Sequence, residues 1–265
     1  MKRLCGGTLI QHVCFIGAVL LFAAPILASE PVGELGQKLS MAAAFKLRYA
    51  DRQALELYEE VLMVQPDHRE ALLNAAYLNV RLGWVDSDGE RRRLHYQKAY
   101  DHAQRVFGLY PDSYDAHLAI GAAKAKMAKF LSPGDKVRIA WELEEHARFL
   151  LKKRSDNPDV WYLFGWWHFE LARVSVADRF FATLLFGGLP SGASTAQAIE
   201  YLEKAVALKP DYCAYRHDLG LFYERTGNPA KAREQYQRVL SISPKAPEDV
   251  IYIEKARKRL AKLEL

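Results

Sequence analysis

The side chains that could carry chemistry in this chain are its histidines, its cysteines and its runs of charge. The eight histidines do not form a compact metal-ligand spacing; they are His12, His68, His95, His102, His117, His146, His168 and His217. His95 and His102 are seven residues apart and would share one helix face. Two ligands do not complete a zinc site. We therefore expect a chance surface pair, with no metal and no cofactor.

The cysteines offer little more. Cys5 and Cys14 lie near the start of the chain, so a processed protein would keep only Cys213. One cysteine forms no internal disulfide and no cysteine-based metal site. Because Cys213 opens a predicted helix, we interpret it as an inert small residue, with a reactive thiol as the alternative.

Catalytic motifs are also absent from the sequence. It contains no Gly-rich phosphate loop, no H-E-x-x-H pair and no G-x-S-x-G elbow. The run Arg91–Arg93 is typical of a solvated helix start, with an anionic partner site as the alternative. The run Lys152–Arg154 suits the last turn of a helix, where positive charge is favourable. The sequence predicts a non-enzyme, and a catalytic site assembled only by the fold is the alternative.

The elements that would position these side chains follow a repeat. The segment 213–246 spans 34 residues and contains a helix, a break at Thr226–Pro229 and a second helix before Pro244. Small residues and aromatics recur at the positions where two helices of a hairpin touch. This spacing is that of a tetratricopeptide repeat (TPR).

The same spacing recurs four times upstream. The predicted hairpins are 35–68, 69–83 with 94–110, 114 onward with 135–154, and 158–172 with 195–211. The predicted packing residues are Trp161, Gly165, Ala198, Gly220, Tyr223, Ala232 and Tyr236. The polar segment 84–94 is predicted to be a loop because it contains acidic residues and Asp-Gly.

Two further helices are predicted outside the hairpins. Apolar residues recur with helical period between Val174 and Leu185, inside the fourth hairpin, and the pattern ends at Gly187 and Gly188. The segment 248–265 is apolar on one side and charged on the other, as a helix that closes the last repeat should be. The predicted fold is an all-α, TPR-like α-solenoid, a right-handed superhelix with one inserted helix and a C-terminal capping helix.

The N-terminus predicts export. Lys2 and Arg3 precede an uncharged apolar run, 13–28, that is long for a signal-peptide core and short for a spanning helix. A cleaved secretory signal is the favoured interpretation, and a retained membrane anchor is the alternative. The predicted organisation is a signal peptide or anchor at 1–28, a linker at 29–36 and the repeat domain at 37–265. The body would then be periplasmic or secreted.

Charge argues against nucleic-acid binding. The formal net charge is +5, and removing Lys2 and Arg3 with the leader lowers it to +3. Domains that bind nucleic acid concentrate more positive charge on one face. Half of the residues are hydrophobic, which suffices for one helical domain.

Part of this pattern resembles a known family. The segments FGWWHFELA, LLFGGLPSGAS and AIEYLEKAVALKP, with the long helix VRIAWELEEHARFLLKK before them, resemble the C-terminal domain of the regulator of microtubule dynamics family. The resemblance covers roughly residues 40–262. It implies a non-catalytic TPR-like adaptor, microtubule-associated if the protein is cytoplasmic. With the leader, the chain resembles a bacterial exported relative.

A TPR array binds through its concave face, which the first helix of each hairpin lines. The residues predicted to line this groove are Asn74, Tyr77, Arg81, Tyr162, Trp166, Phe169 and His217. Trp166 or Phe169 packing against the inserted helix is the alternative. The inward positions lack the repeated Lys and Asn of a carboxylate clamp, so a hydrophobic peptide segment or an apolar ligand suits the lining better.

Three hypotheses result. The leading one is a scaffold that binds an unidentified protein partner in the groove. The second is a carrier of a lipid or other apolar ligand, motivated by the aromatic lining and the inserted helix. The third is an enzyme with an unrecognised site.

Overall fold

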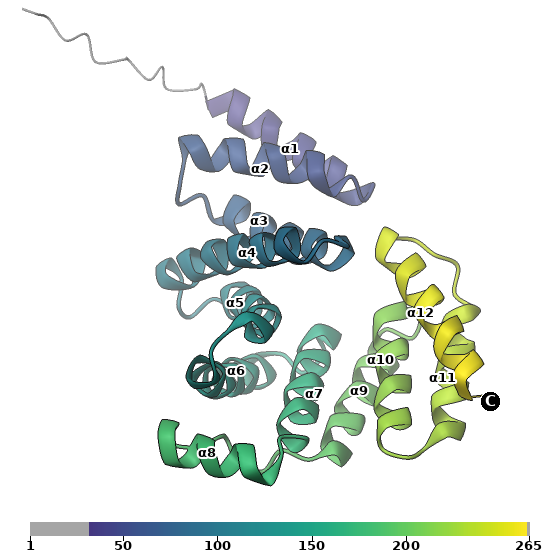
Figure 1. The fold of residues 1–265 in the computed structure, drawn as a ribbon. Coiled ribbons are helices and arrows are strands. Elements are labelled where there is room, and N and C mark those ends of the chain that lie inside the picture. Colours follow the sequence, from purple (N-terminus) through teal and green to yellow (C-terminus); the bar gives the residue numbers. More distant parts are fainter. Residues whose placement is uncertain (1–31, 264–265) are drawn as a thin grey trace, which may run out of the picture.

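The computed structural model describes residues 32–263, and the secondary structure of this part of the chain is all helical, with twelve α-helices, one short 3-10 helix and no strand. Ten of the α-helices pair into five antiparallel hairpins (Figure 1). They are α1 (Val32–Leu47) with α2 (Asp51–Val64), α3 (Arg69–Val85) with α4 (Gly89–Leu109), α5 (Tyr114–Met127) with α6 (Pro133–Lys153), α7 (Pro158–Ala172) with α9 (Thr195–Leu208), and α10 (Cys213–Arg225) with α11 (Pro229–Leu240). The predicted fold class is confirmed.

Caps and small residues explain why these segments form hairpins. Asn228 accepts a hydrogen bond from the Lys231 backbone N–H, and Pro229 opens α11. Gly227 reverses the chain between α10 and α11 at φ 78°. A Cβ placed on Gly220 would lie 2.7 Å from the Tyr236 ring, so only glycine lets α10 and α11 approach this closely.

The predicted packing residues occupy such contacts. Gly165 lies against Leu202 and the carbonyl oxygen of Ala198, where α7 meets α9. Ala198, Ala232 and Tyr236 are fully buried, and Tyr223 is nearly so. Trp161 donates its indole N–H to the Ser155 carbonyl at 2.7 Å and lies beside the Tyr201 ring.

Two sequence predictions need correction. The segment 84–94 is not a loop, because α3 runs to Val85 and α4 starts at Gly89. Asp88 caps α4 by accepting from the Arg91 backbone N–H at 2.8 Å, and Asp86 pairs with the Arg91 side chain. The predicted linker at 29–36 is also too long, since α1 begins at Val32. The predicted leader, 1–28, lies outside the described residues.

The helix α8 (Val176–Phe186) is the inserted helix, and its prediction is confirmed. It packs on α6, where Phe186 lies against Gly134 and the Trp141 indole N–H donates to the Gly188 carbonyl at 3.0 Å. Gly187 ends the helix at φ 80°, a conformation that suits glycine. The helix therefore lies at the end of the molecule beside α6 (Figure 1).

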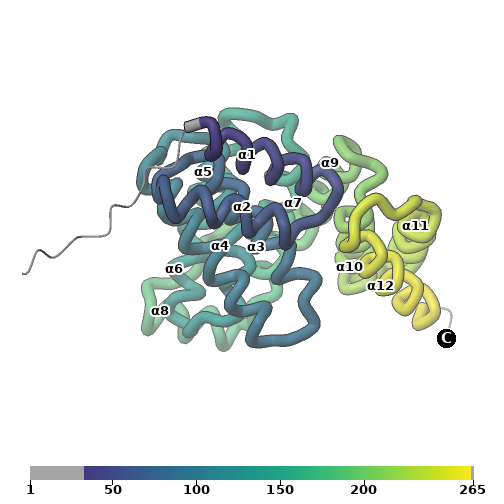
Figure 2. The backbone as a smooth tube through the Cα atoms, turned by 90° about the horizontal axis from the view of Figure 1, so that it is seen from above, coloured from purple at the N-terminus to yellow at the C-terminus, as the bar shows by residue number. Residues whose placement is uncertain are grey.

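The terminal helix α12 (Pro247–Leu263) packs on α10 and α11, as predicted for a cap, and it also contacts α3. Seen from above, α10, α11 and α12 lie together beside the earlier hairpins (Figure 2). The contact with α3 joins the last element of the repeat domain to its second hairpin. Within residues 32–263, no helix is both long and apolar enough to cross a membrane.

Candidate functional site

The predicted groove residues lie on the first helices of their hairpins, and the structure divides them into two groups. Asn74, Tyr77 and Arg81 follow one another along α3. The remaining four, Tyr162, Trp166, Phe169 and His217, meet where α7 packs on α10. The helix α12 contacts both groups, because Glu248 reaches Arg81 and the Tyr252 ring lies 5.3 Å from the His217 ring.

Arg81 is the centre of the α3 group. Its guanidinium is 3.2 Å from Asp51 on α2 and 2.9 Å from Glu248 on α12, with all three side chains largely buried. Burial raises the pKa of Asp51, which Arg81 opposes. Arg81 therefore ties three helices together, and its charge is already engaged within the protein.

The rest of the α3 group is more open. Tyr77 is 50% exposed, and the guanidinium of Arg81 lies 5.7 Å from the centre of its ring. Asn74 accepts a hydrogen bond from the Lys46 ammonium at 2.6 Å. An open hollow of about 290 Å³ is lined by Lys46, Leu47, Tyr49, Tyr77 and Arg81. This hollow leaves one side of Tyr77 open.

Asp218, which the sequence prediction missed, is the centre of the second group. The buried carboxylate accepts from the Tyr162 hydroxyl at 2.6 Å and the Trp166 indole N–H at 3.0 Å. The His217 Nδ1 lies 2.7 Å from its other oxygen. Burial, with Asp218 beside it, raises the pKa of Tyr162 far above its usual value, so the hydroxyl stays protonated and donates.

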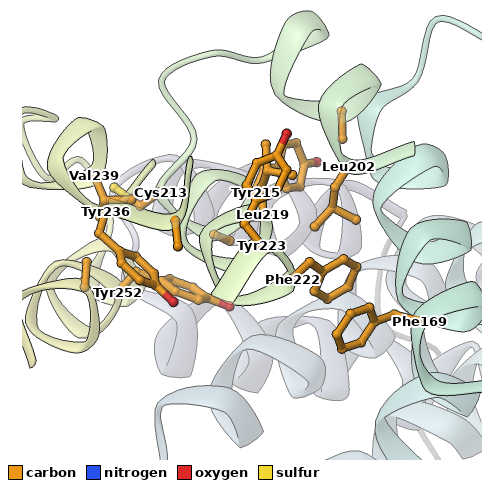
Figure 3. Packing of buried hydrophobic residues seen from close by; sticks show 14 of the residues in the cluster. Phe169, Leu202, Cys213, Tyr215, Leu219, Phe222, Tyr223, Tyr236, Val239 and Tyr252 are labelled. Carbon is orange, nitrogen blue, oxygen red and sulfur yellow. The ribbon is translucent and has the colours of Figure 1, made fainter. Parts of the chain in front are cut away.

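Phe169 and His217 do not line an open surface. Phe169 is completely buried, and its ring stacks on Phe222 of α10 at 3.7 Å (Figure 3). His217 is 6% exposed. Phe169 thus packs against α10, whereas the alternative prediction had placed it against the inserted helix. Tyr77, Tyr162 and Trp166 are the aromatic groove residues that keep some exposure.

The helix α12 supplies residues that the groove prediction did not include. The Tyr252 ring stacks on Trp84 of α3 with centroids 5.3 Å apart, and the Lys255 ammonium lies 4.1 Å from the Trp84 ring. Trp84 was not among the predicted site residues because it is the first residue of the segment 84–94, which was predicted to be a loop. Asp218 could have been found as the one acidic residue in the apolar stretch CAYRHDLGLFY.

The chemistry of this arrangement is that of holding helices together. Three groups, from Tyr162, Trp166 and His217, lie at hydrogen-bond distance from the Asp218 carboxylate. None of them is a nucleophile that the sequence analysis predicted. The Cys213 thiol is buried, and burial together with Asp249 raises its pKa to about 12, which agrees with its interpretation as an inert small residue. Among residues 32–263 there is no group of three or more side chains that could hold a metal ion.

A second surface lies on α8. Its large apolar side chains are exposed, although Phe186 also contacts Gly134 of α6, and only Ala182 is buried. The exposed residues are Val176, Phe180, Phe181, Leu184, Leu185 and Phe186. The features that suggested a carrier of apolar ligands are therefore separated, because this helix packs on α6 and the aromatic groove residues lie on α3 and α7.

Stacked antiparallel helix pairs with small residues at each crossing define the tetratricopeptide-like class of helical repeat proteins. Within this class, the sequence matches the family described as regulator of microtubule dynamics protein 1–3 over residues 39–264. The chain belongs to this family, and the resemblance noted from the sequence is confirmed.

A solved structure of a TPR protein shows the same class of fold. A thermophilic TPR protein of Thermus thermophilus overlays with a TM-score of 0.61 at 16% identity, covering 86% of this chain and 99% of that one. MamA from Desulfovibrio magneticus overlays with a TM-score of 0.49 at 17% identity, covering 79% of this chain and 94% of that one. A comparison with curated protein sequences gives no match.

Proposed function

We propose that this protein is a non-catalytic scaffold that binds a segment of a partner protein on the concave side of the superhelix, beside α3 and α12. The observation that carries this proposal is the open hollow at Tyr77, next to the charged contact between Arg81 and Glu248. Aromatic and arginine side chains often supply much of the binding energy of protein interfaces. The helical repeat provides the rigid frame.

A crosslinking experiment tests this proposal. A photoreactive phenylalanine analogue placed at Tyr77 should capture a defined polypeptide. The same analogue at Met63, which is exposed on α2, is the matched control. The captured segment, made as a peptide, should bind the purified protein and lose affinity for the Tyr77→Ala variant. Equal capture at both positions, or equal affinity for the variant, would overturn the proposal.

The pair Tyr162→Ala and Trp166→Ala is a poorer test. Both side chains donate to the buried Asp218, and removing them leaves this carboxylate with fewer partners. Such a loss destabilises the fold itself. Loss of binding in that variant would not separate the two causes, whereas Tyr77 is exposed and can be truncated at little cost.

The compartment is part of the proposal. A basic start followed by the apolar run 13–28 supports export of the repeat domain, with a retained anchor as the alternative. A cytoplasmic location would favour a role with microtubules, as the family description suggests. Sequencing the N-terminus of the mature protein distinguishes these cases, because a chain that starts near residue 29 has been cleaved and exported.

A further inference from the structure

Two lysines lie over the Trp84 ring near the contact between α3 and α12, and a third lies over the Tyr96 ring. Lys126 of α5 lies 5.0 Å from the Trp84 ring, and Lys255 of α12 lies 4.1 Å from it. Lys129, in the short 3-10 helix (Ala128–Phe130) that follows α5, lies 5.0 Å from the Tyr96 ring. We call Lys126, Lys129 and Lys255 the lysine cluster. Its members come from the third hairpin and from the terminal helix α12.

The cluster carries more positive charge than its surroundings balance. None of the three ammonium groups lies within ion-pair distance of a carboxylate of the described chain. Asp218 acts on Lys126 and Lys255 only from a greater distance. Asp218 is already hydrogen-bonded to Tyr162 and Trp166. Burial lowers the pKa of each lysine, and the neighbouring cations add to this effect. An anion beside these lysines would relieve their mutual repulsion.

Trp84 gives a second and independent indication. Its indole N–H is buried and has no hydrogen-bond partner within the described chain. An unpaired buried donor costs free energy that a bound acceptor would recover. Oxygen anions are the ligands that suit an indole N–H donor and ammonium groups alike.

The cluster is also accessible. Lys129 and Lys255 are exposed and Lys126 is half-buried, so solvent reaches the cluster mainly at Lys129 and Lys255. This arrangement differs from the carboxylate clamp, whose repeated Lys and Asn are missing from the inward positions. Here the charges come from α5, the 3-10 helix and α12. An acidic segment lying here would bridge the third hairpin and the terminal helix α12.

We propose that the lysine cluster binds acidic side chains of the partner segment, with Glu or Asp carboxylates placed against Lys126, Lys129 and Lys255. This inference rests on the proposed scaffold function and adds the chemistry of the bound segment. Several carboxylates along a peptide match separate point charges better than one compact anion does.

Binding of designed peptides tests the inference. A fluorescent eight-residue peptide rich in Glu should bind the purified full chain, and the same peptide with Gln should bind at least about tenfold more weakly. Added salt should weaken the Glu peptide because exposed charges are screened. Equal binding of both peptides, or no binding of the Glu peptide, overturns the inference.

Variants then locate the site. Lys126→Gln with Lys255→Gln should weaken the Glu peptide about tenfold or more. The matched control, Lys152→Gln with Lys258→Gln, alters exposed lysines on α6 and α12 and should change the affinity less than about twofold. Should the first variant fail to fold, Lys129→Gln tests the same point, since this side chain is exposed. Equal loss in the test and control variants overturns the proposal.

Two further arms separate other anions. A peptide that carries phosphoserine among Gln residues, or vesicles of anionic lipid, overturns the inference if it binds through the lysine cluster while the Glu peptide does not. The scaffold proposal fails separately, when the photoreactive group at Tyr77 captures nothing. If a captured segment binds but ignores Lys126→Gln with Lys255→Gln, the scaffold stands and the lysine cluster does not.

Discussion

The two helices outside the five hairpins, α8 and α12, attach to the repeat in opposite ways. The helix α12 is rich in charge, yet it buries Tyr252 and Ala256 and makes specific contacts with α3, α10 and α11. The helix α8 is largely apolar, yet it buries only Ala182 and rests on α6. Hydrophobic content alone therefore does not decide how firmly a helix is held. What decides is whether the neighbouring surface offers matching side chains.

The contacts explain this difference. Tyr252 meets Trp84 face to face, and Glu248 meets Arg81, so α12 has partners of matching shape and charge. Phe180 and Leu184 of α8 point toward solvent and meet no comparable surface. An exposed apolar face of this kind is typical of an interaction surface.

The largest expected effect is at Tyr252. Tyr252→Ala removes a nearly fully buried ring between α12, α10 and α3, and it should lower the free energy of unfolding by about 3–5 kcal/mol. Urea denaturation followed by circular dichroism measures this change. Val250→Ala, at an exposed position on the same helix, is the control and should change it by less than about 0.5 kcal/mol. Equal effects would show that α12 is not held as described.

Acidification should lower the free energy of unfolding by a smaller amount. It acts through α6, the helix on which α8 packs. His146 of α6 is buried beside His117 at 3.0 Å and the Lys124 ammonium at 3.2 Å. Burial, then Lys124 and His117, lowers the pKa of His146 to about 3. Protonation is thus favoured in the unfolded chain, where the histidine pKa is about 6.5. The contribution of His146 to the free energy of unfolding is therefore fully present above about pH 6.5, and it is lost as the pH falls toward 3.

Lowering the pH from 7 to 5 should therefore reduce the free energy of unfolding by about 2 kcal/mol through His146. Urea denaturation at both pH values measures this change. His146→Gln removes the titrating group, so its stability should change less over the same interval. The account of this buried pair is wrong if the wild-type protein and the variant lose the same stability.

The smallest effect on stability should come from α8. Phe180→Ser with Leu184→Ser changes two exposed side chains and should alter the free energy of unfolding by less than about 0.5 kcal/mol. The same variant should bind less of a hydrophobic dye, because it removes much of the apolar face. A loss of several kcal/mol would show that α8 is buried against another part of the protein.

The sequence predicted the repeat well because each hairpin is specified locally. Gly220 with Tyr236 and Gly165 with Leu202 are close contacts between helices of the same hairpin, so a fixed spacing reveals them. The inserted helix was found for the same reason, through the period of its apolar residues and its terminal glycines.

The closure by α12 was not predictable in this way. Trp84 and Tyr252 are separated by most of the repeat domain, and no spacing rule connects them. Asp218 follows an inward-facing position, yet its partners Tyr162 and Trp166 come from a different hairpin. Groove residues such as Phe169 were placed by position alone, and packing between α7 and α10 buried that ring.

The central claim is that α12 closes onto α3 through Trp84 and Tyr252. A double-mutant cycle on the free energy of unfolding, with Trp84→Leu, Tyr252→Leu and the two together, tests it most directly. The stacked pair predicts a coupling free energy of about 0.5–1.5 kcal/mol. Effects that add to within about 0.3 kcal/mol would contradict the closure and remove the basis for a site between the two helices.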